Sequence, residues 1–207
     1  MKSKKKNKAK IKSKEVEEKI EVLEKDDIDY LNSLDVWIVS HGGCGSNYIA
    51  DLLEENNINV RLKKGRINNY NYGKYCHLSF IPKDVKTKIL YVYGDLINSA
   101  YSQEKRNILQ FNLHKLKSYH NHSDSNDPFN YLFQYNNFYN NQNVISLKYP
   151  YSKNDLLECF KKLKINISDE KIQIKKRKNI FNQEYLNESS DDMKKIFEFY
   201  KGIKKII

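Results

Sequence analysis

The sequence predicts an α/β fold, in which a mostly parallel central sheet carries helices on both of its faces. Short continuous runs of β-branched, aromatic and aliphatic residues, such as VWIVS at 36–40 and KILYVY at 88–93, are typical of strands buried on both sides. Segments with apolar residues at helical spacing follow these runs, and strands that alternate with helices favour parallel pairing. The 207 residues, of which 39% are hydrophobic, suffice for one domain with a sizeable core.

The other elements follow from local patterns. NYIADLLEENN at 47–57 places Ile49, Leu52 and Leu53 on one face of a helix. DPFNYLFQYNNFY at 127–139 begins with Asp and Pro, which favour the N-cap and the first position of a helix. Further strands are predicted at 58–62, 74–80 and 144–149, and further helices at 15–25, 96–117, 152–165 and 191–206.

The positive charge is concentrated at the N-terminus. The net charge is +11, and residues 1–14 contain eight lysines and no acidic residue. Such a segment buries too little apolar surface to offset the entropy lost in ordering it. We therefore expect residues 1–30 to form a basic, largely disordered arm with at most a short helix, and residues 31–207 to form the α/β domain. The arm either keeps the protein in solution or binds an anionic partner (nucleic acid, anionic lipid) or a nuclear import receptor.

Cysteine usage and hydropathy narrow the class of protein. Cys44, Cys76 and Cys159 are odd in number, widely spaced and in no CxxC pair, which argues against a disulfide framework and against a zinc site. We expect reduced thiols and no bound metal. No segment has the pattern of a signal peptide or approaches the roughly 20 apolar residues that span a bilayer. These features predict a soluble intracellular protein, cytoplasmic or nuclear, with no transmembrane segment.

Three of the seven glycines lie within four positions, at Gly42, Gly43 and Gly45, directly after the predicted strand at 36–40. A glycine-rich turn that leads into a helix near Ser46 would direct backbone N–H groups and the positive end of the helix dipole at one point, which is an anion site. Glycine lets the backbone approach a phosphate closely and adopt a positive φ. The pattern is equally compatible with a plain tight turn. It lacks the lysine of the ATP-type P-loop, which argues against an NTPase.

The order of motifs along the chain favours the phosphate-binding interpretation. The segments GCGSNY (43–48), CHLS (76–79), YGDLINSAYS (93–102) and VISLKYP (144–150) occur in the order found in the sulfotransferase family, which the chain resembles over roughly residues 35–205. The resemblance implies a P-loop NTPase-like sulfotransferase architecture. It also implies that the donor, 3′-phosphoadenosine 5′-phosphosulfate, binds at the glycine turn and that the acceptor is a hydroxyl of a carbohydrate or small molecule.

The resemblance also assigns roles to individual residues. In the family, a turn of the form K-S-G-T-T-W holds the 5′-phosphosulfate of the donor, and Gly45, Ser46 and Asn47 match its phosphate-binding part. Ser102 matches the serine that contacts the 3′-phosphate, and Asp95 matches an acidic residue of the same motif. His77 stands where the family often has the base that takes the proton of the acceptor hydroxyl.

The chain departs from the family at the positions of its cations. Gly43 stands where the family has Lys, and Gly94 and Leu96 stand where it has Arg and Pro. Sulfuryl transfer builds up negative charge on the leaving nucleotide, and the loss of one donor to such a charge typically costs roughly 2.7 to 4 kcal/mol.

Three groups are candidate substitutes for the missing cations. His41 lies in the same turn, and Arg106 follows Ser102 by one helical turn. The basic run KKRKN at 175–179 is the third, although a solvated charge cluster accounts for it better. The expected donor-binding residues are therefore His41, Gly42, Gly43, Cys44, Gly45, Ser46, Asn47, Ser102 and Arg106.

Three functions remain open on the sequence alone. The first is an active sulfotransferase with His77 as the base. The second is a catalytically weak or inactive relative that still binds the nucleotide, which the loss of both cations favours. The third is a nucleic-acid-associated protein that acts through its basic arm.

Overall fold

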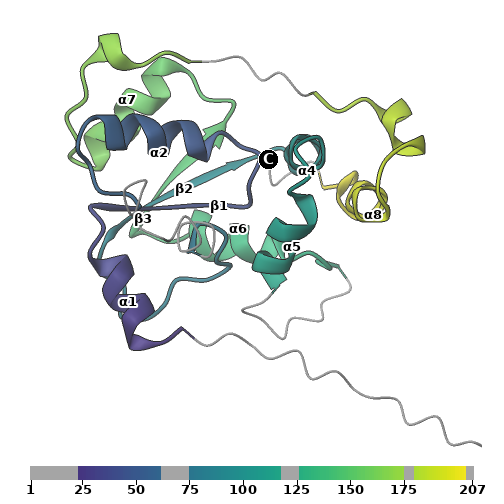
Figure 1. Ribbon diagram of the computed structural model, residues 1–207, viewed down its shortest axis with the longest axis horizontal. Coiled ribbons are helices and arrows are strands. Elements are labelled where there is room, and N and C mark those ends of the chain that lie inside the picture. The colour runs from purple at the N-terminus through teal and green to yellow at the C-terminus, as the bar shows by residue number, and fades with distance from the viewer. Residues whose placement is uncertain (1–22, 62–74, 118–125, 175–179, 204–207) are drawn as a thin grey trace, which may run out of the picture.

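The structure is a computed structural model that describes residues 23–61, 75–117, 126–174 and 180–203. Within these residues, β1 (Val36–Ser40), β2 (Lys88–Gly94) and β3 (Val144–Tyr149) form a parallel sheet in the order β1-β2-β3 (Figure 1). In the register of the sheet, Val36 lies beside Lys88 and Ile89 lies beside Val144. The predicted α/β class with a parallel sheet is therefore confirmed, and so are the three strands predicted near these positions.

Helices cover both faces of the sheet, as predicted. Helices α2 (Ser46–Glu55) and α7 (Lys153–Lys162) lie over one face, and α1 (Lys25–Asn32) and α6 (Tyr131–Tyr139) lie over the other (Figure 1). Successive side chains of β1 point to opposite faces, so that Ile38 packs in the core under α2 and α7, whereas Trp37 packs in the core against α6. This two-sided burial explains why β1 and β2 are continuously apolar rather than alternating.

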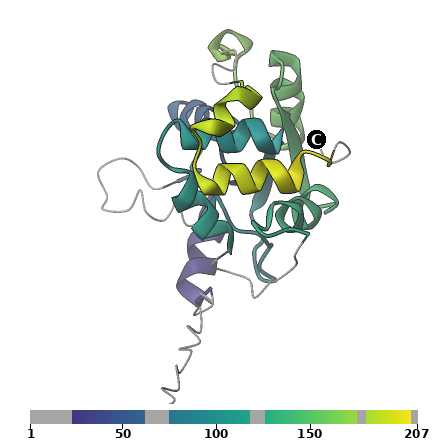
Figure 2. The ribbon, with the colours of Figure 1, turned by 90° about the vertical axis from the view of Figure 1, so that its right-hand side faces the viewer.

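A third group of helices lies beyond the carboxyl end of the sheet. It consists of α4 (Leu96–Glu104), α5 (Leu109–Lys117) and α8 (Asp191–Tyr200), which share a core of their own. Figure 2 shows α8 alongside α4. Two short 3-10 helices, η1 (Asp169–Lys171) and η2 (Gln183–Asn187), complete the described elements.

Three helices end in the same way, and this corrects two predicted boundaries. After α2, α4 and α7, one residue adopts a left-handed conformation and the following isoleucine donates its N–H to a carbonyl of the last turn. This is the Schellman motif, which stops a helix. The predicted helix 96–117 is therefore two helices, separated at Asn107, and the predicted helix 152–165 ends at Lys162. The three bonds are Ile58 N to Leu53 O at 3.0 Å, Ile108 N to Gln103 O at 3.1 Å and Ile165 N to Phe160 O at 2.9 Å.

Two predicted strands, 58–62 and 74–80, are absent from the described residues. Residues 58–61 and 76–80 are irregular, and residue 75 ends a helical turn. The segment after residue 75 is nevertheless buried beside β1: its backbone accepts hydrogen bonds from the Trp37 indole (3.1 Å) and from the Ser40 amide (2.7 Å). Isolated bonds of this kind satisfy the backbone without a strand ladder, which is why an apolar run here is not a strand.

The remaining boundaries also differ from the prediction. Helix α6 begins at Tyr131 rather than near Asp127, because Asn130 is left-handed (φ 58°) and the Asp127 carboxylate accepts the amide N–H of Phe133 instead of capping at its own position. Helix α8 ends at Tyr200, short of the predicted residue 206. Helix α1 begins at Lys25, where the predicted helix 15–25 was expected to end, and residues 23 and 24 are not helical. Residues 15–22 lie outside the described residues, as do the basic segments 1–14 and 175–179.

Two kinds of feature are absent from the residues that the structure describes. No helix there has the length and apolar content needed to cross a bilayer. The same residues contain no group of three or more His, Cys, Asp or Glu side chains placed to hold a metal ion.

Candidate functional site

The glycine turn links β1 to α2 at the carboxyl end of the sheet. Gly42, Gly43 and Gly45 all have positive φ, at 88°, 71° and 81°. Helix α2 begins at Ser46, as predicted, and Gly45 caps it without a side-chain hydrogen bond. The first N–H groups of a helix have no acceptor within the helix, and the positive end of the dipole lies there. The turn therefore has the positive-φ glycines and the helix start on which the anion-site prediction depends.

Two of these glycines are also required by packing. A Cβ at Gly43 would lie 2.3 Å from the backbone oxygen of Ser99 in α4. A Cβ at Gly42 would lie 2.8 Å from Nδ2 of Asn112 in α5. The turn thus packs closely against α4 and α5 on one side. A plain tight turn would need glycine at these positions for the same reason.

Buried amide side chains hold the turn in place. Gln103 Nε2 donates to the backbone oxygen of His41 at 3.2 Å, and Asn112 Nδ2 donates to Gln103 Oε1 at 2.6 Å. Both amides are buried, and so is His41, whose ring packs edge-on against Tyr131 at 5.5 Å. His41 was expected to act as a substitute cation, but it lies in the core beside the turn.

Hydroxyl and thiol groups complete the inside of the turn. Ser40 Oγ donates to Ser46 Oγ at 3.1 Å and accepts the Gly42 N–H at 3.2 Å. Cys44 is buried, with its Sγ 3.0 Å from the Val92 carbonyl oxygen, whereas Asn47 is exposed at the start of α2. Cys44 is thus a packing residue, and its thiol is not disulfide-bonded.

The two positions at which the sulfotransferase motifs carry cations have no room for a side chain. At Gly43 the obstacle is the Ser99 carbonyl, and at Gly94 a Cβ would lie 2.9 Å from the Tyr149 backbone oxygen. The backbones of β2 and β3 and of the turn and α4 approach one another too closely there. The two departures are therefore linked to the packing of this chain, and any cation at the site must come from another position.

His77 lies next to the first residues of the turn, in an irregular segment rather than in the predicted strand 74–80. Its Nδ1 is 2.7 Å from the backbone oxygen of Ser40. A carbonyl oxygen only accepts, so Nδ1 carries the hydrogen of the neutral ring and Nε2 carries the lone pair. Burial lowers the pKa of His77 from 6.5 to about 4; the hydrogen bond to Ser40 opposes this, and the charges of Lys115 and Arg106 lower the pKa further.

Two cations are close enough to influence His77. Arg106 is exposed, follows α4, and donates from Nε to the Ser102 carbonyl oxygen at 2.9 Å. Lys115 in α5 is only 3% exposed and lies one turn beyond Asn112. Lys115 was not among the residues predicted from the sequence. Its signal was a lysine within the apolar face of a helix, between Leu113 and Leu116.

Only part of the motif at residues 93–102 lies against the glycine turn. Asp95 caps α4 by accepting the Asn98 amide at 2.6 Å, which is a structural role. Helix α4 meets the turn through Ser99 and Gln103. Ser102 is half-buried and shares a helical face with Asn98, next to the face that meets the turn.

We compared the chain with models of protein families, with curated proteins and with solved structures. Nothing matches. The resemblance to sulfotransferases therefore stays a prediction from the sequence.

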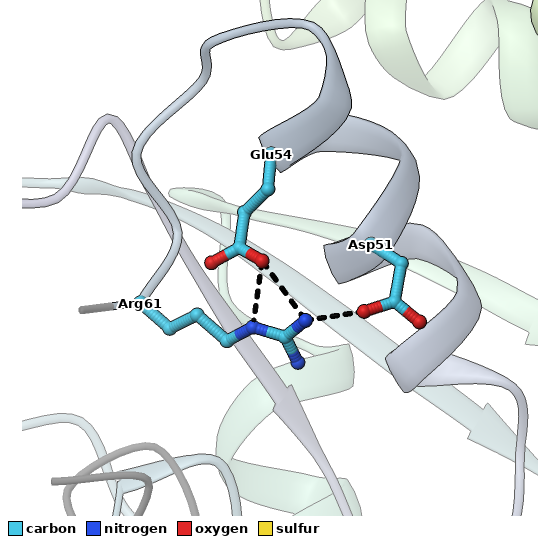
Figure 3. A network of polar contacts seen from close by, with 3 residues as sticks. All are labelled: Asp51, Glu54 and Arg61. Carbon is cyan, nitrogen blue, oxygen red and sulfur yellow. Dashed lines mark hydrogen bonds and ion pairs between the residues drawn. The ribbon is translucent and has the colours of Figure 1, made fainter. Parts of the chain in front are cut away.

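A separate polar cluster lies at the other end of α2. Arg61 reaches back to the helix and pairs with Glu54, at 2.9 Å, and with Asp51 (Figure 3). Burial lowers the pKa of the Arg61 guanidinium, but the hydrogen bonds that it donates to both carboxylates, together with their charges, outweigh burial and raise the pKa. These residues line a cavity of about 650 Å³ far along α2 from the glycine turn. The cluster fixes the chain after α2 and is not part of the candidate site.

Replacement of Arg61 by methionine is expected to lower the free energy of unfolding by about 1 to 2 kcal/mol, because Glu54 would keep a partly buried carboxylate without its main partner. Urea denaturation measures the change. Lys194→Met is the control, because the Lys194–Asp191 pair is exposed and 3.9 Å long, and its loss should cost less than about 0.5 kcal/mol. Equal losses in the two variants would contradict a structural role for the Arg61 cluster.

Proposed function

We propose that the chain is a sulfotransferase-type protein that binds 3′-phosphoadenosine 5′-phosphosulfate at the carboxyl end of its sheet. The observation that carries the proposal is the strand–turn–helix unit of β1, residues 41–45 and α2, whose glycines have positive φ and whose helix lacks a side-chain cap. The acceptor is a hydroxyl group of a carbohydrate or small molecule. We propose the sulfotransferase architecture, the donor and the acceptor together.

Phosphate binding at this turn follows from simple electrostatics. The N–H groups at the start of α2 and the helix dipole favour an anion. Arg106 and Lys115 add positive charge near His77. In our proposal this charge replaces the cations that the family motifs carry at the positions of Gly43 and Gly94. We therefore assign the phosphate-neutralising role to these two cations.

His77 is the proposed base for transfer. The acceptor oxygen attacks the sulfur, the bond between sulfur and the bridging oxygen of the nucleotide breaks, and 3′-phosphoadenosine 5′-phosphate leaves with the electron pair. The acceptor proton passes to Nε2 of His77, the ring nitrogen that carries the lone pair. A bound anion beside Arg106 and Lys115 offsets their charges, which raises the pKa of His77 and makes it a better base in the complex than in the free protein.

Nucleotide binding without turnover is the second candidate. Two observations favour it: the positions of both family cations are filled by backbone, and the pKa of His77, at about 4 in the free protein, is low for a base at neutral pH. Action on nucleic acid would depend on the arm at residues 1–14, which lies outside the described residues.

Calorimetric titration with 3′-phosphoadenosine 5′-phosphate tests the binding site. We expect saturable binding heat from the contacts of the nucleotide phosphates with the turn and its neighbouring cations. Lys115→Met should weaken binding at least about tenfold, because a buried cation near a phosphate contributes more than about 1.4 kcal/mol. The exposed Lys148→Met, at the far strand of the sheet, is the control.

Absence of binding heat at millimolar nucleotide would overturn the proposal. If the nucleotide binds but no transfer from labelled donor occurs in a broad screen of hydroxyl acceptors, the second candidate is the correct one.

A further inference from the structure

Strand β3 is an exposed edge of the sheet. Within the described residues it pairs with β2 alone, and five of its six residues are exposed or half-buried. The opposite edge strand, β1, is buried at all five positions and is covered by the segment around residues 75–76. A cavity of about 370 Å³ runs along β3. An edge strand of this kind presents N–H and C=O groups that pair readily with another strand.

Helix α7 flanks this edge with an ordered row of side chains, three of which are charged. Asp155, Glu158, Cys159 and Lys162 line the same cavity as β3. Their spacing of i, i+3, i+4 and i+7 places them on one face of the helix. The spacing of these four residues is symmetric about the midpoint of the row. Its two ends carry opposite charges, negative at Asp155 and positive at Lys162. An antiparallel copy of α7 would therefore place Lys162 opposite Asp155, twice.

The midpoints of β3 and of this row lie near each other. From the midpoint of β3 to its end the chain advances about 8 Å, at roughly 3.3 Å per residue. Helix α7 returns in the opposite direction, and from its start to the midpoint between Glu158 and Cys159 it rises about 8 Å, at roughly 1.5 Å per residue. One two-fold axis beside β3 can therefore lie close to both midpoints.

We propose that two copies of the chain associate through β3. The two β3 strands pair antiparallel across a two-fold axis, and the adjacent α7 helices form two Asp155–Lys162 ion pairs. An interface of this symmetry must be self-complementary, and the charge row of α7 meets that condition. The exposed Lys148 does not oppose the pairing, because it alternates with Leu147 and points to the face away from α7.

Sedimentation equilibrium of the full chain tests the association. We expect a species of twice the 24.7 kDa chain mass that grows with concentration. Lys162→Glu should weaken association at least about tenfold, since it turns both ion pairs into repulsive contacts. Lys161→Glu is the matched control: it makes the same charge change at an exposed neighbouring position that does not line the cavity, and it should change association less than about twofold.

Two further measurements locate the interface. The double variant Asp155→Lys/Lys162→Glu re-forms the pairs with reversed charges and should restore association. Because Asp155 also accepts the Ser152 amide at the cap of α7, the melting temperature of each variant shows whether it is folded. Hydrogen exchange of the amides of residues 144–149 should slow as the wild-type concentration rises.

A wild-type chain that stays monomeric over the accessible concentrations overturns the proposal. This holds even if an added extended peptide binds β3, because the edge would then take a different partner. Equal effects of Lys161→Glu and Lys162→Glu, or exchange of residues 144–149 that is independent of concentration, also overturn it.

Discussion

Gly43→Ala is expected to lower the free energy of unfolding by about 2 to 5 kcal/mol. Two costs add: the residue must keep a φ of 71°, which costs an alanine about 1 to 2 kcal/mol, and its Cβ would lie 2.3 Å from the Ser99 oxygen, which forces the turn and α4 apart at a further cost of about 1 to 3 kcal/mol. Urea denaturation followed by the fluorescence of Trp37, the single tryptophan, measures the loss.

Gly202→Ala is the matched control for Gly43→Ala. A Cβ at Gly202 meets nothing within 4 Å, so this variant should stay within about 0.5 kcal/mol of the wild type. A loss below about 1 kcal/mol for Gly43→Ala would show that the turn can move away from α4 without difficulty, and it would remove the packing argument against a cation at this position.

Acidification from pH 7 to pH 4 is expected to remove stability on the order of 3 kcal/mol through His77 alone. Burial holds the pKa of His77 at about 4 in the folded chain, against 6.5 for an ordinary histidine. Between these values the unfolded chain binds the proton more readily than the folded chain does, so stability rises with pH across this window and is complete above pH 6.5. Urea denaturation at one-unit pH steps measures the slope.

His77→Asn isolates this contribution. Asparagine keeps a donor for the Ser40 carbonyl oxygen but does not titrate, so the stability difference between wild type and variant should shrink as the pH falls. Replacement of His114, at an exposed position of α5, by Asn tests whether the loss of any histidine has this effect. A difference between wild type and His77→Asn that is the same at pH 7 and pH 4 would contradict the buried neutral histidine.

The sequence was sufficient for elements whose pattern reflects burial on both faces. The strands predicted at 36–40 and 88–93 are continuous apolar runs, which favour a buried strand, and the start of α2 at Ser46 follows a glycine turn, which favours a change of element. The run at 74–80 has the same composition, but its backbone is satisfied by Ser40, by the indole of Trp37 and by side chains of α6, and no local pattern encodes such partners. Tertiary context decided that segment.

Helix ends and the cations of the candidate site were harder to predict for different reasons. The break at Asn107 had a signal, since Asn adopts the left-handed conformation readily and an Asn–Ile pair also ends α2. Lys115 had only the weak signal of a lysine on an apolar face, because its proximity to His77 depends on how α5 packs. The close approach of Gly43 to Ser99 could not be predicted, since it depends on the placement of α4.

The way in which α4 and α5 hold the glycine turn has a consequence for the order of folding. The bond from Gln103 to His41 joins residues 62 positions apart, and every strand pair in the sheet joins segments at least as distant as Val36 and Lys88. Proteins dominated by such non-local contacts fold slowly, because long loops must close before the contacts form. During synthesis, β1 and its turn therefore leave the ribosome long before their partners exist. The proposed anion site is complete only when the chain has passed Lys115, so that a chain truncated before this residue should lack the site even when β1 and α2 are intact.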